Sequence, residues 1–196
     1  MEKSMNKLLL IPITFLILIS VGQTNEVLIE KLLEKADVIY EDRLLDRNGV
    51  KYKVNTQTGY TGTGVIAHSN GNLKQKTSYK LGLRHGSFES YYKNGQLERK
   101  ATYKDGKVHG SSVDYFSNGQ WGIKAFFKDG NLDGPFESYY ENGQLKNKAT
   151  FKNGLQEGFL EQYYENGQLQ EKLFFIEDEQ QSAPHEKYYL NGQISK

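Results

Sequence analysis

The feature that most constrains this chain is an Asn-Gly pair that returns every 24 residues. The pairs of this series begin at positions 70, 94, 118, 142 and 166, and the last begins at 191, one residue late. An aromatic pair precedes most of them, as in Tyr139-Tyr140-Glu141-Asn142-Gly143-Gln144-Leu145. A fixed period of this length is typical of repeat proteins, in which each unit contacts only its neighbours. The chain of 196 residues is therefore expected to form an array and not one globular core.

The Asn-Gly pairs predict tight turns between antiparallel strands. Asn-Gly is the favoured pair for a two-residue type I′ turn, in which both residues need a positive φ. With Asn94-Gly95 at the tip, Tyr92 pairs with Leu97 and Glu89 pairs with Lys100. The predicted structural turns are Asn94-Gly95, Asn118-Gly119, Asn142-Gly143 and Asn166-Gly167.

A second series of turns joins one hairpin to the next. Asp105-Gly106 is the first clear example, and it places Tyr103 opposite Val108 and Ala101 opposite Gly110. Alternation then sorts the side chains onto two faces. The predicted apolar face carries Phe88, Tyr92, Leu97, Ala101, Tyr103 and Val108. The predicted polar face carries Glu89, Tyr91, Glu98, Lys100, Thr102 and His109.

The same sorting holds in two later repeats, which start from Phe136 and from Leu160. The predicted fold class is all-β: an elongated single-layer antiparallel β-meander of 24-residue hairpin repeats. The array is expected to cover residues 60–196, with a degenerate capping unit at its C-terminal end, where Pro184 and lysines would protect the sheet edge.

Two surfaces are candidates for binding. The polar face carries a tyrosine column, and a tyrosine ring with its polar tip suits contacts with protein or sugar. The alternative is that these rings only cover the stems of Lys and Glu. The apolar face must curl on itself, be covered by the N-terminal segment or meet a partner, which makes self-association reasonable. The candidate residues are Tyr91, Tyr115, Tyr139, Tyr163 and Tyr188 on the polar face, and Trp121, at the Leu97 position, as an anchor.

The sequence does not predict an enzyme. His85 and His109 fall two strands apart, roughly 10 Å, which is too far for a shared metal ion. The glutamates at 89, 137 and 161 each face a lysine, and exposed cross-strand pairs explain them. A G-x-G-x-x-A string at residues 62–67 is followed by turn residues, so it lacks the helix that a dinucleotide site needs. No catalytic residue, metal or cofactor is expected.

The N-terminus predicts export. Residues 8–21 are apolar, follow two lysines and are too short for a typical membrane span, so residues 1–22 are expected to be a signal peptide cleaved after Gly22. The alternative is an uncleaved N-terminal anchor in the inner membrane. Residues 23–59 form a predicted lead-in, with a short amphipathic helix at 26–36 and then a hairpin of strands 38–45 and 50–54 around Arg47-Asn48-Gly49.

Charge and cysteine content narrow the classes of partner. The chain has no cysteine, which excludes disulfides and a lipidated N-terminal cysteine. Loss of residues 1–22 removes two of 25 basic and one of 24 acidic residues, which leaves 23 of each. A nucleic-acid binder normally carries a basic excess, so nucleic acid is not expected as a partner.

The repeat unit resembles a known family. Tyr-Tyr-x-Asn-Gly-Gln-Leu, followed by Lys-Asp-Gly-Lys-Val-His-Gly as in residues 104–110, is similar to the MORN repeat variant of bacterial proteins over roughly residues 60–196. Gly49-Val50-Lys51-Tyr52 followed by Thr61-Gly62 resembles the lead-in of the YwqK-like antitoxins. The first resemblance implies an elongated single-layer sheet used as a binding and assembly platform. The second implies a protein that binds one cognate toxin.

These expectations combine into a non-catalytic, secreted or periplasmic repeat scaffold. Its partner is expected to be a protein, which includes a second copy of the chain. The first alternative hypothesis is an antitoxin or immunity-type protein. The second is a protein that binds polysaccharide or a lipid surface through the tyrosine column.

Overall fold

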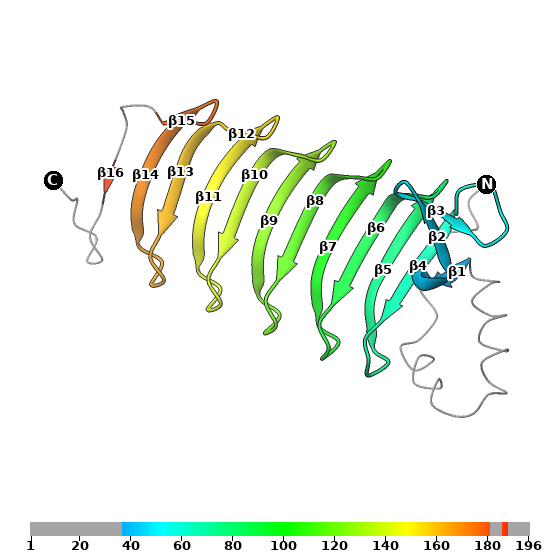
Figure 1. Ribbon diagram of the computed structural model, residues 1–196. Helices are drawn as coiled ribbons and strands as arrows, with labels where there is room; N and C mark the ends of the chain where they lie inside the picture. The colour runs from blue at the N-terminus through cyan, green and yellow to red at the C-terminus, as the bar shows by residue number, and fades with distance from the viewer. Residues whose placement is uncertain (1–36, 181–185, 188–196) are drawn as a thin grey trace, which may run out of the picture.

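The protein is a long antiparallel sheet in which almost every strand pairs with the strand that follows it in the chain (Figure 1). The computed structural model describes residues 37–180 and 186–187. The predicted signal peptide, the predicted helix at 26–36 and Tyr188 lie outside the described residues. The strands of the array are β4 (Gly62–Ala67), β5 (Leu73–Lys80), β6 (Leu83–Tyr91), β7 (Leu97–Lys104), β8 (Lys107–Tyr115), β9 (Trp121–Lys128), β10 (Asn131–Tyr139), β11 (Leu145–Lys152), β13 (Gly158–Tyr163) and β14 (Leu169–Ile176).

This arrangement confirms the predicted meander of hairpins. The interior register is also as predicted, because Glu89 pairs with Lys100 and Phe88 pairs with Ala101. No helix in the described part of the chain is long and apolar enough to cross a membrane.

The lead-in covers the first edge of the array. Strand β1 (Val38–Tyr40) pairs in parallel with β4, and a 3-10 turn (Glu41–Arg43) leads into the separate hairpin of β2 (Leu44–Arg47) and β3 (Val50–Lys53). The predicted hairpin is therefore confirmed only for β2 and β3. A small core of Leu44, Tyr60 and Tyr79 lies here, and the Tyr60 hydroxyl donates to the Asp37 carbonyl at 2.8 Å. The G-x-G-x-x-A string lies in β4 and runs through a turn into β5.

The turns at the Asn-Gly edge differ from the prediction. Gly95 has a φ of +86°, but Asn94 is not among the residues with positive φ. The Tyr92 carbonyl accepts the Gly95 N–H at 2.9 Å, and the Tyr92 N–H donates to the Gln96 carbonyl at 2.8 Å. This is a three-residue loop, in which a type I turn is followed by one left-handed glycine that forms a bulge. The type I′ assignment was therefore wrong for this edge.

The opposite edge carries the type I′ turns. Asp105 and Gly106 have φ values of +49° and +85°, and the equivalent pairs at 129–130 and 153–154 are also both positive. Each turn glycine donates its N–H to the preceding hairpin, as in Gly106 to the Arg84 carbonyl at 2.9 Å. These bonds continue the sheet through its turns.

The extra loop residue changes which side chains share a face. Ser90 pairs with Arg99 but Tyr91 pairs with Leu97, so Glu98 is the additional residue of a bulge. The prediction that Leu97 lies on the apolar face was wrong. Leu97 lies beside Tyr91, and Tyr92 belongs to the loop.

A second bulge recurs at the repeat glycines. Tyr103 pairs with Val108 as predicted, but Ala101 pairs with Ser112 and not with Gly110. Strand β8 therefore has extra residues opposite β7, which form a bulge. Gly110 has a φ of +95°, which allows this bulge, and β8 bends at this point. The repeat glycines still pair with the aromatic column on the other side, as in Gly110 with Phe127.

The apolar side chains pack on one face, which we call the packed face. The packed face carries Phe88 and Tyr103 together with the residues at the same positions of the other repeats. The rings of Phe88 and Tyr103 lie 5.6 Å apart, and those of Phe136 and Phe151 lie 5.8 Å apart. Ala101, which pairs with Phe88, is buried. Tilted rings over small residues therefore provide the packing in a single layer.

The last unit is irregular, as predicted. Strand β14 is followed by Glu177 and Asp178, both with positive φ, and then by β15 (Glu179–Gln180). Both β15 and β16 (Glu186–Lys187) pair with β14, while β12 (Leu155–Gln156) pairs with β11.

Candidate binding surface

Tyrosines line the face opposite the packed face, and we call it the tyrosine face. It carries Tyr91, Tyr115, Tyr139 and Tyr163, the last residues of strands β6, β8, β10 and β13. Three of the four hydroxyls donate to the glutamate two residues earlier: Tyr91 to Glu89 at 2.9 Å, Tyr139 to Glu137 at 2.5 Å and Tyr163 to Glu161 at 3.0 Å. Burial, together with this carboxylate, raises the pKa of Tyr139 and of Tyr163 to about 12. These hydroxyls are fixed donors on half-exposed rings.

An apolar residue stands beside each tyrosine. Leu97, Trp121, Leu145 and Leu169 pair with Tyr91, Tyr115, Tyr139 and Tyr163. Trp121 was predicted at the Leu97 position, and this equivalence is confirmed. Both residues lie on the tyrosine face, however, and not on the apolar face where the prediction placed them. The tyrosine face is consequently more apolar than the sequence suggested.

Trp121 is the largest exposed side chain of this face. It is 48% exposed, and its ring lies 5.8 Å from that of Tyr139. The Lys124 ammonium lies 2.9 Å from the centroid of the Trp121 ring and 5.2 Å from that of Tyr139. A lysine over an aromatic face is an attractive contact, and it holds both partners in place.

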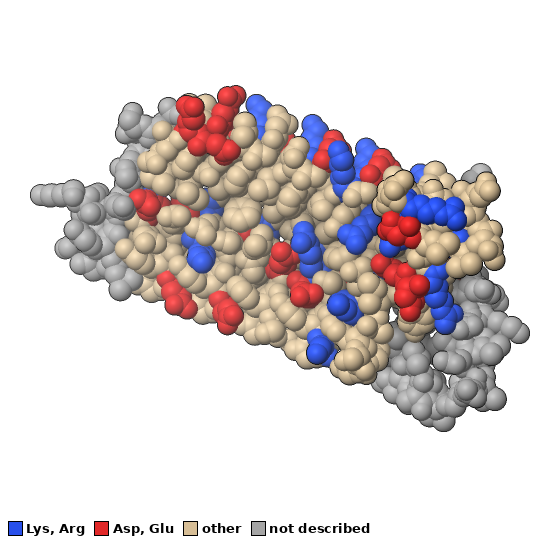
Figure 2. Space-filling view, viewed as in Figure 1, with Lys and Arg blue, Asp and Glu red and all other residues tan. Residues whose placement is uncertain are grey.

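A row of alternating charges runs beside the tyrosines. Lys100 Nζ lies 3.8 Å from Glu89 Oε1, and Lys172 Nζ lies 3.1 Å from Glu161 Oε1, which confirms these two predicted cross-strand pairs. Glu137 pairs in register with Lys148. At the glutamate position of β8 stands Val113, which faces Lys124. Figure 2 shows both signs of charge interspersed on the viewed face, with no large patch of one sign.

A shallow groove of about 290 Å³ opens beside Val113. Its lining includes Ser111, Val113, Lys124, Phe126, Pro135 and Glu137, all contributed by strands β8, β9 and β10. Phe126 is 43% exposed. The equivalent positions one repeat earlier and one later are Thr102 and Thr150, whereas two repeats later the position is Phe174, which pairs with Phe159.

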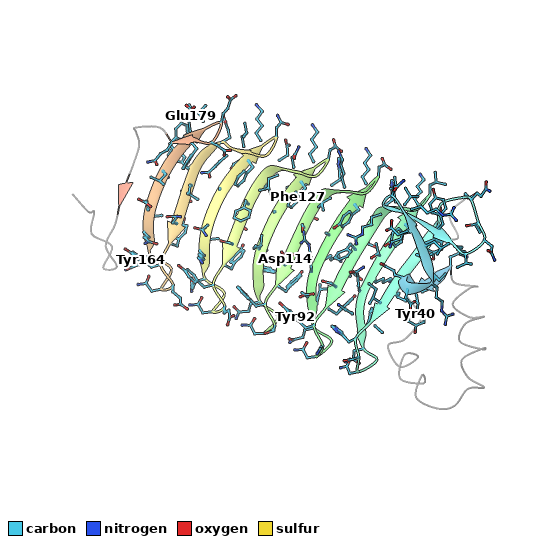
Figure 3. The ribbon with its side chains drawn as sticks, in the orientation of Figure 1. Tyr40, Tyr92, Asp114, Phe127, Tyr164 and Glu179 are labelled. Atoms are coloured by element: carbon cyan, nitrogen blue, oxygen red, sulfur yellow. The ribbon has the colours of Figure 1, made fainter. Side chains whose placement is uncertain are left out.

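The second tyrosine of each pair has a structural role that sequence reasoning missed. The Tyr92 hydroxyl donates to the Tyr115 carbonyl at 2.7 Å, and the Tyr140 hydroxyl donates to the Tyr163 carbonyl at 2.8 Å. Figure 3 places Tyr92 and Tyr164 at the Asn-Gly edge of the sheet, with Phe127 nearer the opposite edge. The sequence did offer a signal for this contact. The donor and the acceptor are 23 residues apart, one fewer than the repeat period, so the second tyrosine of one pair is in step with the first tyrosine of the next pair.

The turn asparagines make a parallel contact between repeats. Asn118 Nδ2 donates to the Glu141 carbonyl at 2.9 Å, and Asn142 Nδ2 donates to the Glu165 carbonyl at 2.9 Å. These two loops are thus tied to the loop of the next repeat, whereas the Asn94 and Asn166 amides donate to Gln96 and Gln168 within their own loops. The tyrosine rows are therefore held at a regular spacing along the sheet.

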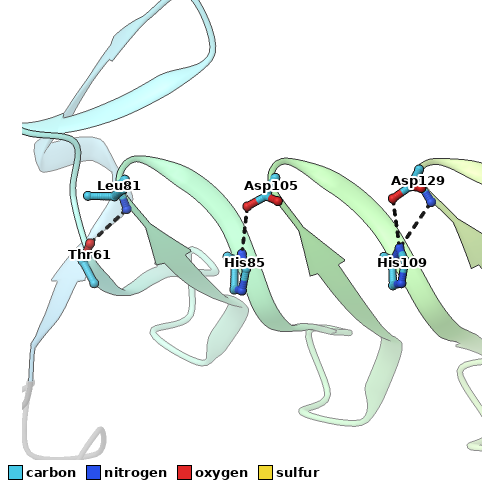
Figure 4. Close-up of polar contacts among 6 residues, drawn as sticks. All are labelled: Thr61, Leu81, His85, Asp105, His109 and Asp129. Carbon is cyan, nitrogen blue, oxygen red and sulfur yellow. Dashed lines mark hydrogen bonds and ion pairs between the residues drawn. The ribbon is translucent and has the colours of Figure 1, made fainter.

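His85 and His109 contact the turns at the other edge (Figure 4). His85 Nδ1 lies 3.2 Å from Asp105 Oδ1, and His109 Nδ1 lies 3.1 Å from Asp129 Oδ1. Thr61, one repeat before His85, accepts the Leu81 N–H at 2.9 Å in the same way. This position therefore contacts the turn of the next hairpin. Within residues 37–180, no group of three or more His, Asp or Glu side chains is placed to hold a metal ion.

Comparison with known proteins supports the repeat assignment. Residues 84–105, 132–153 and 156–177 match the family model of the MORN repeat variant. The first two stretches coincide with the hairpins β6–β7 and β10–β11. Among curated proteins, none matches the chain. Repeats of this type are in general modules for binding proteins or membranes, and the chain carries at least three of them.

Proposed function

We propose that this protein is a non-catalytic repeat scaffold that binds another protein through its tyrosine face. The observation that carries the proposal is the row of half-exposed tyrosines, each beside Leu or Trp, in which three of the four hydroxyls are held by hydrogen bonds.

The chemistry of this row suits a protein partner. Tyrosine and tryptophan contribute large contact areas and lose few rotamers on binding, and they are enriched at the energetic centres of interfaces. Here the rings are fixed before binding, so little further ordering is required. Strands two apart repeat about every 10 Å, which suits an extended partner segment that crosses several repeats.

The packed face supports a partner less well. Phe88, Ala101 and Ala149 are buried by their neighbours on this face. The self-association expected of an open apolar sheet therefore has less apolar area available. A second copy bound through the tyrosine face is a separate outcome, which sedimentation of the purified chain would detect.

We further propose that the protein acts outside the cytoplasm, released by cleavage after residue 22 or held by an uncleaved N-terminal anchor. This proposal depends on the apolar stretch at residues 8–21. The resemblance of residues 49–52 and 61–62 to the lead-in of YwqK-like antitoxins keeps an immunity role as the alternative.

The experiment is affinity purification from the native cell with the full chain and with a Tyr115/Tyr139/Tyr163→Ala variant. Binding through the tyrosine face predicts that a stoichiometric protein partner is recovered with the wild type and lost with the variant. The matched control is Thr102/Thr150→Ala, which alters the middle of the same face. Retention of the partner by the tyrosine variant would contradict the proposal. A single toxin-like partner would select the immunity role.

A further inference from the structure

One hairpin of the array departs from the others on the tyrosine face. In strands β6, β10 and β13 a glutamate lies two residues before the tyrosine, but in β8 this position is Val113. The same hairpin carries Trp121 in place of leucine, and it carries Phe126 where the neighbouring hairpins have Thr102 and Thr150. The groove of about 290 Å³ lies at this place.

The neighbouring repeats show what the missing carboxylate does. Each glutamate accepts a hydrogen bond from its tyrosine hydroxyl at 2.5–3.0 Å. Glu89 and Glu161 also lie 3.8 Å and 3.1 Å from a lysine on the next strand. One carboxylate thus satisfies a tyrosine donor and a lysine together.

The donors remain around Val113 although the acceptor is gone. Among the described residues, the Tyr115 hydroxyl has no hydrogen-bond partner. Val113 lies between Lys100 and Lys124 in the sheet register. Of these lysines, Lys100 shares the carboxylate of Glu89, and Lys124 lies over the Trp121 ring without a carboxylate within 4 Å in the described chain. Two ammonium groups and one hydroxyl therefore surround the uncharged Val113 side chain, while the carboxylate of the groove lining, Glu137, accepts from the Tyr139 hydroxyl.

We propose that this groove binds a partner polypeptide through an aspartate or glutamate side chain that takes the place of the missing glutamate above Val113. The ligand carboxylate accepts from the Tyr115 hydroxyl and meets Lys100 and Lys124. Apolar side chains on either side of it in the partner pack on Trp121 and on Phe126, which are 48% and 43% exposed and lie on either side of Lys124 along β9. The inference deepens the proposed function, because it requires the tyrosine face to be the binding surface.

The charge pattern favours an acidic segment over a basic one. The lysine–glutamate row reads Lys100, Val113, Lys124, Glu137 and Lys148 across β7 to β11, so positive charge exceeds negative charge here. A charged pair at an interface gives specificity when both charged groups are held in place and partly removed from water. The Lys124 ammonium meets this condition because it lies over the Trp121 indole ring. The apolar lining provides that environment.

The test uses the full chain and a displayed library of random linear peptides. Selected peptides are made with both ends blocked, so that only side-chain carboxylates remain, and their binding is measured by calorimetry. We expect acidic residues next to apolar ones, and a loss of about tenfold or more when the acid is changed to its amide. Selected peptides that lack acidic residues would overturn the inference.

The decisive variants restore residues that the other repeats already contain. Val113→Glu fills the site from within the protein, so it should weaken peptide binding about tenfold or more while thermal stability is kept or raised. Trp121→Leu should weaken binding by a similar factor without unfolding the chain. Ile123→Asn, which restores the residue of β11 on the packed face, should leave binding unchanged and serves as the matched control. Unchanged binding by Val113→Glu would overturn the inference.

Two further results separate this inference from the proposed function. If Tyr115/Tyr139/Tyr163→Ala abolishes binding but Val113→Glu and Lys124→Gln do not, the carboxylate site is refuted and the tyrosine face remains the binding surface. If none of these variants affects binding, both proposals are refuted. If no peptide is selected and the chain binds vesicles of phosphatidylcholine and phosphatidylserine in a manner lost in Lys124→Gln, the lysine serves a membrane surface and the inference is overturned.

Discussion

The β8–β9 and β10–β11 hairpins share one backbone but differ on both faces. Both have the same three-residue loop and the same bulge, with Tyr115 paired to Trp121 and Tyr139 paired to Leu145. On the packed face, β8 has Ser112 where β10 has Phe136. The glycines and loops therefore fix the scaffold, while the residues between them can change without disturbing it.

The packed face of β8–β9 is correspondingly more polar. Asp114 Oδ1 lies 3.3 Å from Arg99 Nε, and Arg99 Nη2 donates to Ser112 Oγ at 3.2 Å. Burial raises the pKa of Asp114, while the nearby guanidinium opposes that shift. Figure 3 places Asp114 in the middle of the array. This hairpin thus has less aromatic packing than its neighbour and a more apolar tyrosine face.

The largest effect is expected from making β10 resemble β8 on the packed face. Phe136→Ser removes a half-buried ring that lies 5.8 Å from the Phe151 ring. A fully buried phenylalanine costs 3–5 kcal/mol when truncated, so about 2 kcal/mol of unfolding free energy should be lost here. Denaturant titration would measure the loss, with Thr150→Ser as the surface control. A change below about 0.5 kcal/mol would show that this packing does not support the array.

The next effect concerns the loop that both hairpins share. Gly143 has a φ of +86°, so Gly143→Val should lower the unfolding free energy by about 1–3 kcal/mol, because a β-branched residue resists this conformation. Gly143→Asn should recover much of that loss, since asparagine tolerates a left-handed backbone. Equal melting temperatures for Gly143→Val and the wild type would contradict the turn assignment.

A smaller effect separates the two hairpins at their tips. Phe116 stands in β8–β9 where the other repeats have a tyrosine whose hydroxyl donates to the next repeat. Tyr140→Phe should cost about 1 kcal/mol and Phe116→Tyr should gain up to about 1 kcal/mol, the usual range for one hydrogen bond. Thermal unfolding of both variants measures the difference. By analogy with Tyr92 and Tyr140, the new hydroxyl in Phe116→Tyr is expected to donate to the Tyr139 carbonyl. A loss of stability in both variants would contradict that bond.

The smallest effect on stability comes from copying Val113 into β10. Glu137→Val should change the unfolding free energy by less than about 1 kcal/mol, because exposed cross-strand pairs contribute little. Its effect on titration should be clearer. Burial and the hydrogen bond to Glu137 raise the pKa of Tyr139 from 10.0 to about 12, and the variant should bring that pKa back toward its ordinary value.

The sign of the pH effect follows from the direction of that shift. A raised tyrosine pKa favours the protonated folded state, so the stability it contributes is complete below pH 10 and is lost as the pH rises to about 12. Phenolate absorbance of Glu137→Val, with Tyr139→Phe subtracted to isolate the residue, would follow the change. An unaltered Tyr139 titration would contradict the hydrogen bond.

Sequence reasoning predicted the interior of each hairpin but not its tip. The pairs Phe88–Ala101 and Glu89–Lys100 were predicted correctly, because the middle of a strand depends only on alternation and on the strand centre. Asn-Gly does not determine a turn by itself. Asn48-Gly49 has two positive φ values, as a type I′ turn requires, but in Asn94-Gly95 only the glycine has one.

The candidate site depended on that difference. One extra loop residue moves Leu97 beside Tyr91, and it moves Trp121 to the tyrosine face as well. The tyrosine column itself was predictable from the period. The contact of Lys124 with Trp121 and the groove beside Val113 were not, because both depend on the register at the bulge.

The central claim is that the tyrosine face, and not the packed face, meets the partner. The most direct test places a photocrosslinking benzoylphenylalanine at Trp121 or at Ile123, two positions of strand β9 that lie on opposite faces and are 48% and 37% exposed. After illumination in the native cell, the account predicts a protein adduct from position 121 and none from position 123. An adduct from position 123 alone would contradict it.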